Sequence, residues 1–103
     1  MTDPLLAGLR ERIERYRETG DGAAVLDNEV ELELAALLGP NEGFNPESYH
    51  VGGMVHWLRY RAGSTSGRDL TEAARLLALV HDHGRGYEIP GPLRLILECR
   101  RAG

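Results

Sequence analysis

The sequence predicts an all-α fold in which about five helices stack as antiparallel hairpins. Apolar residues recur every three or four positions in most segments, which is the spacing of one helix face. Glycine and proline residues divide the chain into segments of helix length. Alternation typical of a strand occurs only in residues 30–34, and a lone strand would have no partner.

The chain of 103 residues matches the size of one small domain. We therefore expect a single helical domain over residues 1–103. Within it, we expect an N-terminal helix pair (1–38), a helical hairpin (46–83) and a C-terminal helix (92–101).

The first helix is predicted to start at Pro4 with Asp3 as its N-cap, and to end at Gly20–Gly22. One apolar stripe faces the core: Leu5, Leu6, Leu9, Ile13 and Tyr16. The second helix is predicted to run unbroken from Ala23 to Leu38. Its stripe comprises Leu26, Val30, Leu34, Leu37 and Leu38.

Asn45 and Pro46 indicate the N-cap and first turn of a third helix, after a loop whose Phe44 is expected to pack on the core. Two glycines, Gly52 and Gly53, lie in the middle of this helix and cost roughly 1 kcal/mol each relative to alanine. That cost predicts close approach of a neighbouring helix at this point.

Asp69, with Glu72 three residues later, has the pattern of a capping box at the start of a fourth helix. Its predicted apolar positions are Leu70, Ala73, Ala74, Leu77 and Val80. Gly84–Gly86 would end it, and a short fifth helix is expected from Leu93 to Arg101.

Charge and composition restrict the class of protein. The net charge of −4 gives no general attraction to nucleic acid or to an anionic membrane, although residues 1–51 carry −7 and residues 52–103 carry +3. All twelve basic residues are arginine, which suggests a high-GC bacterial genome. No apolar run has the ~20 residues of a membrane span. A lone Cys99 and the absence of a secretory signal predict a cytoplasmic protein.

Residues 46–97 resemble a tetratricopeptide repeat, a helical hairpin with fixed small and aromatic positions. With Gly53 on the glycine of the repeat, the matching positions are Tyr49, His56, Ala73 and Leu77. The departures from the pattern are Gly52, Val80, Pro90 and an insertion over residues 62–68.

The run from Gly53 to Ala62, followed by Asp69–Leu70 and Ala73–Ala74, is similar to helical-repeat segments of large actinobacterial proteins. The resemblance implies arrays fused to caspase-like CHAT peptidase domains or to other effector modules. It extends to the repeat and not to the peptidase, because Cys99 lacks the histidine setting of a cysteine nucleophile.

His81, Asp82 and His83 form the only cluster in the sequence that looks like metal ligands. Residues i and i+2 of a helix point to opposed sides, so we interpret the two histidines as a cationic helix end. His50 and His56 also fall on different faces of one helix. We predict no metal, no cofactor and no catalytic residue. A small metal-binding or hydrolytic protein using His81 and His83 remains the alternative.

The arginines and aromatic residues around the third helix are the best functional candidates, because both residue types dominate interface hot spots. The candidate partner-binding residues are Tyr49, Trp57, Arg59, Tyr60, Arg61 and Arg68. Trp57 is assigned to the core, which leaves Tyr60 and Arg61 as the exposed pair. We therefore expect a scaffold or adaptor module that binds another protein or a like helical module, with self-association left open. Nucleic-acid binding through the basic C-terminal half is disfavoured by the overall acidity.

Overall fold

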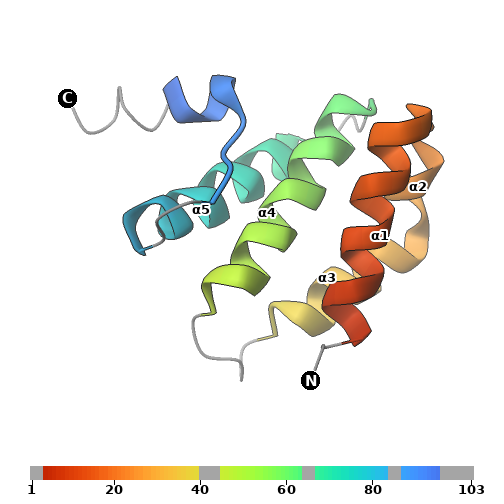
Figure 1. Cartoon of the computed structure of the whole chain (residues 1–103), viewed down its shortest axis with the longest axis horizontal. Helices are drawn as coiled ribbons and strands as arrows, with labels where there is room; N and C mark the ends of the chain where they lie inside the picture. Colours follow the sequence, from red (N-terminus) through yellow and green to blue (C-terminus); the bar gives the residue numbers. More distant parts are fainter. Residues whose placement is uncertain (1–3, 40–44, 64–66, 84–86, 96–103) are drawn as a thin grey trace.

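The computed structural model describes residues 4–39, 45–63, 67–83 and 87–95, and this part of the chain is all-helical, as predicted. Its helices are α1 (Pro4–Thr19), α2 (Ala23–Leu26), α3 (Asn28–Leu37), α4 (Pro46–Arg61) and α5 (Gly67–His83). Residues 91–95 form a further helical turn beyond α5 (Figure 1).

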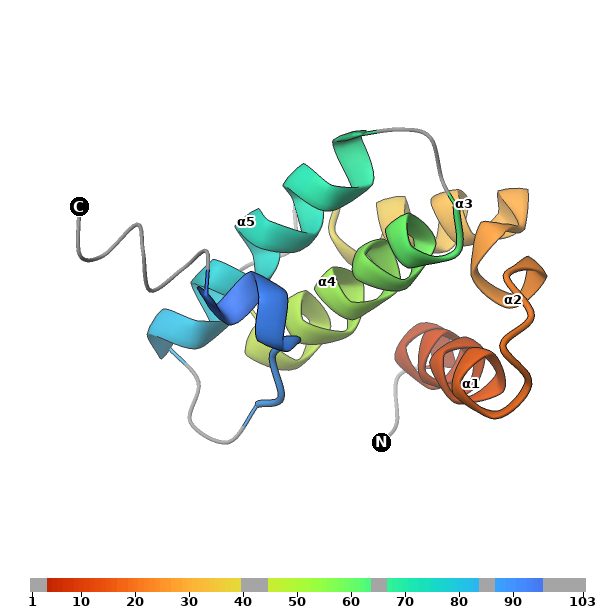
Figure 2. The same ribbon diagram turned by 90° about the horizontal axis from the view of Figure 1, so that it is seen from above.

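Helix α4 lies at the centre of the molecule. It contacts α1, α2, α3 and α5, and its most extensive packing is against α5. Figure 2 shows α4 between α1 on one side and α5 on the other. The core is therefore organised around α4, and side chains of α4 lie at the contacts with each of the other helices.

The sequence around Asn45 explains where α4 begins. The Asn45 side chain accepts hydrogen bonds from the backbone N–H groups of Glu47 (3.0 Å) and Ser48 (3.4 Å), and Pro46 occupies the first turn. This start is confirmed as predicted, as is the start of α1 at Pro4. Trp57 is 9% exposed and belongs to the core cluster, which confirms its assignment to the interior.

The glycine pair of α4 lies where two neighbours approach it. A Cβ on Gly53 would stand 2.7 Å from Leu77 Cγ of α5, and one on Gly52 would stand 2.9 Å from Leu38 Cδ1 beyond α3. Both distances are too short for a real Cβ. The predicted close approach is confirmed, and it occurs on two sides of the same helix turn.

The prediction of one unbroken helix from Ala23 to Leu38 is wrong. Asp27 adopts an extended conformation (φ −60°, ψ 141°) and separates α2 from α3. Its side chain accepts a hydrogen bond from the N–H of Glu29 at 3.1 Å, so it caps α3. The strand-like run 30–34 is helical, as predicted, and Leu32 points outward with 73% exposure.

The predicted N-terminus of the fourth helix is also wrong. Helix α5 begins at Gly67, so Asp69 lies within its first turn and is 6% exposed rather than capping the helix. Its neighbours Ala73, Leu77 and Val80 are buried as expected.

Several predictions concern residues outside the described part of the chain: Asp3, Phe44, the break at residues 84–86, and the C-terminal helix beyond residue 95 with Cys99. Among the described helices, none is both long enough and apolar enough to span a bilayer.

Candidate functional site

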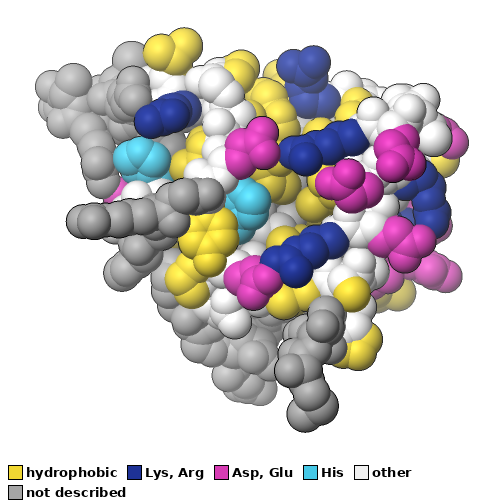
Figure 3. Space-filling view, viewed as in Figure 1, with side chains coloured by type: hydrophobic (Ala, Val, Ile, Leu, Met, Phe, Trp, Pro, Cys, Tyr) yellow, Lys and Arg dark blue, Asp and Glu magenta, His cyan; other side chains and the backbone are white. Residues whose placement is uncertain are grey.

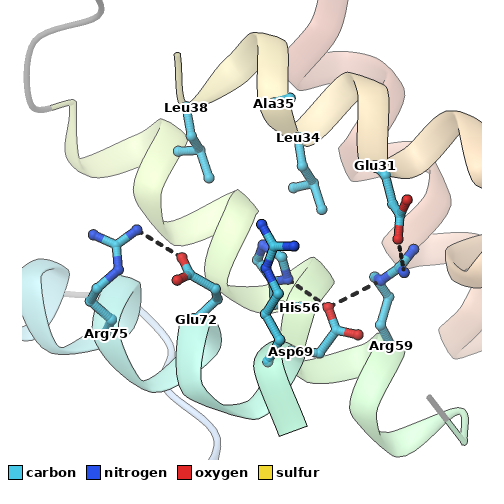
Figure 4. A pocket seen from close by; sticks show the side chains of 10 residues that line it. Glu31, Leu34, Ala35, Leu38, His56, Arg59, Asp69, Glu72 and Arg75 are labelled. Carbon is cyan, nitrogen blue, oxygen red and sulfur yellow. Dashed lines mark hydrogen bonds and ion pairs between the residues drawn. The ribbon is translucent and has the colours of Figure 1, made fainter. Parts of the chain in front are cut away.

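A groove of about 490 Å³ lies between α3, α4 and α5. Figure 4 shows its construction: α3 contributes one wall, α5 the opposite wall, and α4 the floor. The three helices come from separate parts of the sequence, so the groove exists only once the fold has formed.

Arg59, in the last turn of α4, connects the floor to three other helices. Its side chain is 9% exposed. Its Nε donates to Asp69 Oδ1 of α5 (3.2 Å), Nη1 donates to the carbonyl oxygen of Val25 in α2 (3.1 Å), and Nη2 donates to Glu31 Oε1 of α3 (3.1 Å). Because guanidinium donors form a rigid fork, these three bonds fix the relative positions of the helices.

Asp69 is the buried acceptor of this network. Its Oδ1 accepts from Arg59 Nε and also from His56 Nδ1, at 2.8 Å. No buried side-chain nitrogen or oxygen among the described residues lacks a hydrogen-bond partner. The polar floor of the groove is therefore satisfied before any ligand arrives.

The α5 wall carries alternating charges. Glu72 Oε2 accepts from Arg75 Nη2 at 2.7 Å. This hydrogen bond lowers the pKa of Glu72; partial burial opposes the change, and the positive charge of Arg75 adds to it. The same bond raises the pKa of Arg75. Both groups are therefore ionised at neutral pH.

The α3 wall is mainly apolar. Leu34 and Leu38 point toward the charged side chains of α4 and α5 (Figure 4). Leu34 is buried, Leu38 is half-buried and Ala35 is exposed. The groove thus opposes an apolar wall to a charged one, an arrangement that suits an amphipathic partner.

The structure does not bring the six predicted binding residues together. Arg59 and Arg68 line the groove, but the Arg59 side chain is withdrawn into the interior rather than presented to a partner. The rings of Trp57 and Tyr60 stack at 5.9 Å, and Arg61 Cζ lies 5.9 Å from the centre of the Trp57 ring. Tyr60 is 40% exposed and Arg61 is exposed, as predicted for this pair.

Tyr49 is half-buried near the start of α4, away from the Trp57 cluster at its end. The predicted surface is therefore divided among three places. Whether any of them binds a partner stays a prediction.

The remaining groove residues were missed by sequence reasoning, chiefly Glu31, His56, Asp69 and Arg75. The sequence pattern indicates a helix cap at Asp69 and an aromatic position of a repeat at His56. One signal was available: Arg59 directly follows Trp57 and Leu58, two residues with core character, and a buried arginine needs a buried acid.

The histidines fall in three places. His56 lies in the groove, while Nε2 of His50 is 2.7 Å from the carbonyl oxygen of Glu88. His81 Nδ1 is 3.9 Å from Asp82 Oδ1, and the side chain of His83 is outside the described part. Within the described residues, no group of three or more His, Cys, Asp or Glu side chains is placed to hold a metal ion.

Comparison with known proteins adds no assignment to the groove. The chain matches no protein-family model, no curated protein and no solved structure.

Proposed function

We propose that this chain is a non-enzymatic protein-interaction module, a scaffold or adaptor, and that the groove between α3, α4 and α5 is its docking surface. The observation that carries the proposal is the pairing of an apolar wall at Leu34 and Leu38 with a charged wall at Glu72 and Arg75. Protein interfaces combine an apolar centre with a polar rim in this way, and arginine is enriched in them.

The floor of the groove, where the buried polar side chains already have hydrogen-bond partners, supports the same proposal. Asp69 already pairs with Arg59 and with His56, and Arg59 also bonds to Glu31, so these side chains serve to hold α3, α4 and α5 in place. A groove held in this way is pre-organised, which lowers the entropic cost of binding. Specificity would then come from the rim and the apolar wall.

The resemblance of residues 46–97 to a tetratricopeptide repeat supports a binding role for this hairpin. Helices α4 and α5 pack together, and Gly53, the position matched to the glycine of the repeat, is where an added Cβ would stand 2.7 Å from Leu77 Cγ. We propose that the chain is a helical-repeat module of the kind found in actinobacterial CHAT- or effector-associated proteins, acting in the bacterial cytoplasm on another protein or a like module.

Site-specific photo-crosslinking in the producing bacterium tests the groove. A photoreactive amino acid replaces Ala35, an exposed alanine in the groove wall, and in a matched control it replaces Ala23, an exposed alanine of α2. We expect a discrete protein adduct from position 35 that position 23 does not give. An excess of the untagged, unaltered chain should reduce this adduct, whereas the untagged Ala35→Arg variant, whose groove is filled, should not. Identical adducts from both positions, or none from position 35, would contradict the proposal.

The alternative, a metal-binding or hydrolytic protein using His81 and His83, is tested separately. Bound zinc or nickel in the purified chain, together with a lower Tm after chelation, would replace our proposal with this one.

A further inference from the structure

The charged wall of the groove has a regular pattern along α5. Arg68, Glu72 and Arg75 are spaced i, i+4 and i+7, so they form one stripe of alternating sign, positive–negative–positive. The stripe is accessible: Arg68 is exposed, and the side chains of Glu72 and Arg75 are 28% and 55% exposed.

Helix α1 carries the complementary pattern. Glu11, Arg15 and Glu18 have the same spacing and the opposite signs, negative–positive–negative. All three are exposed and lie on the side of α1 opposite the buried Leu9 and Ile13. Figure 3 shows acidic and basic side chains alternating over α1 on the right of the view. Unlike the outward face of α3 with Leu32, this face offers charge rather than apolar surface.

The charges of the two stripes are complementary when α1 packs on α5, but not when α1 packs on α1 or α5 on α5. When α1 of one copy lies on α5 of another, each of the three charges meets an opposite charge, whichever way the helices run. Two α1 stripes in register, or two α5 stripes, would instead place like charges together, which is unfavourable. The pattern therefore favours a head-to-tail contact over a symmetric dimer.

The fold keeps the two stripes apart within one molecule. Helices α1 and α5 lie on opposite sides of α4 (Figure 2), so the two stripes cannot meet within one chain; within the stripes, Glu11 pairs with Arg15 and Glu72 pairs with Arg75. Ala7 and Gly8 precede Glu11 on the same region of α1, and a Cβ at Gly8 would meet nothing within 4 Å. These small residues leave room for a partner helix to approach. The −7 charge of residues 1–51 and the +3 charge of residues 52–103 favour the same orientation.

We propose that the partner of the groove is a second copy of this chain, which docks the Glu11–Arg15–Glu18 stripe of its α1 on the Arg68–Glu72–Arg75 stripe of α5. This inference rests on the proposed function, because it names a partner for the charged α5 wall of the same groove. The contact is heterologous, so repeated contacts build a ring or an open chain rather than a symmetric dimer. Exposed ion pairs are individually weak and screened by salt, so the association is weak and salt-sensitive.

Two stripe-inverted variants test the proposal by sedimentation velocity. In the first, Arg68→Glu, Glu72→Arg and Arg75→Glu invert the α5 stripe. In the second, Glu11→Arg, Arg15→Glu and Glu18→Arg invert the α1 stripe. At about 0.01 M salt, where the screening length is about 30 Å, we expect the average mass of the unaltered chain to rise with concentration. At about 1 M salt, where it is about 3 Å, we expect the monomer.

Each variant alone is expected to remain monomeric, because its two stripes now carry the same pattern. An equimolar mixture of the two is expected to associate again, because each supplies the stripe that the other needs. A monomeric unaltered chain at every concentration in low salt would overturn the proposal, as would association that survives either inversion. Far-UV circular dichroism and Trp57 fluorescence check that the variants fold. If one variant does not fold, the salt dependence of the unaltered chain and the mass of the other variant still test the proposal.

The outcomes separate this inference from the proposed function. A groove adduct with a different protein, together with a monomeric chain, would overturn self-association and leave the docking role intact. No adduct at position 35 and no self-association would overturn both.

Discussion

At the scale of single residues, the most consequential side chain is Arg59. It is a buried cation whose three hydrogen bonds reach α2, α3 and α5. Its partner Asp69 is equally buried and accepts hydrogen bonds from Arg59 and His56. Removing one member of a buried charged pair leaves the other uncompensated, which costs far more than the net stabilisation the pair provides.

We therefore expect Arg59→Met to lower the free energy of unfolding by about 3–5 kcal/mol, the usual cost of breaking a buried pair. The matched control is Arg15→Met, because Arg15 is exposed and makes only an i,i+4 pair with Glu11. That change is expected to cost less than about 0.5 kcal/mol. Urea unfolding followed by circular dichroism measures both. Equal losses for the two variants would show that the Arg59 network does not hold the helices together.

The Glu72–Arg75 pair predicts a small dependence of stability on pH. The hydrogen bond from Arg75 lowers the folded-state pKa of Glu72 below its ordinary value of 4.5. Its stabilisation is therefore fully present above that value and disappears as the pH falls through the lowered pKa. We expect the unaltered chain to be more stable than Glu72→Gln by about 0.5 kcal/mol or less at pH 7, since the pair is partly exposed. The difference should shrink toward pH 3, and a difference that grows instead would reverse the assigned direction.

At the scale of the elements, local signals located helix starts well where the cap and first turn were both explicit. Pro4 and the Asn45–Pro46 pair are examples. The break at Asp27 was missed because the apolar spacing of Val30, Leu34 and Leu37 appeared to continue from Leu26, which is in fact 37% exposed. The spacing of apolar residues indicates which face of a helix is buried. It does not indicate a turn between two consecutive helices whose apolar residues continue the same spacing.

The candidate site was less predictable than the helices, for a related reason. Arg59 and Arg68 were singled out by residue type, but their environment depends on contacts over long sequence separations. Glu31 and Asp69 come to Arg59 from positions 28 residues before it and 10 residues after it. Only the packing of α3 and α5 on α4 brings them together, so no local pattern indicated the groove.

The glycine pair gives the sharpest prediction about the packing of α4 on α5. Gly53→Ala places a Cβ 2.7 Å from Leu77 Cγ, and Leu77 is fully buried and cannot swing away. Overpacking of about 1–3 kcal/mol should outweigh the gain of about 1 kcal/mol in helix propensity. The control is Gly8→Ala in α1, where the new Cβ meets nothing within 4 Å. We expect Gly8→Ala to raise Tm and Gly53→Ala to lower it.

The contrary result would be informative about this interface. If Gly53→Ala raised Tm as much as Gly8→Ala, the two helices would have to lie farther apart than the structure places them. The milder case is Gly52→Ala, because Leu38 is half-buried and the far end of its side chain can move. We expect its effect to fall between those of the other two.

At the scale of the whole molecule, α4 links the other described helices. Helices α1, α2 and α3 contact one another in part, but α5 packs chiefly on α4. The core residues Leu9, Val30 and Leu77, from three different helices, belong to one cluster that Met54 and Val55 of α4 complete. Loss of α4 would therefore expose the apolar faces of all its neighbours at once, and no subset of helices would keep a core of its own.

This arrangement predicts two-state unfolding, with Trp57 as its reporter. Trp57 is the only tryptophan in the sequence and is buried on α4, so its fluorescence reports the centre of the core, while circular dichroism reports all the helices. We expect the two signals to change together in urea, with one midpoint and one slope. If α5 separated from α4 before the other helices unfolded, the circular dichroism and Trp57 curves would have different midpoints. Coincident curves would mean that the groove between α3, α4 and α5 persists to the point of global unfolding, as a pre-organised binding surface requires.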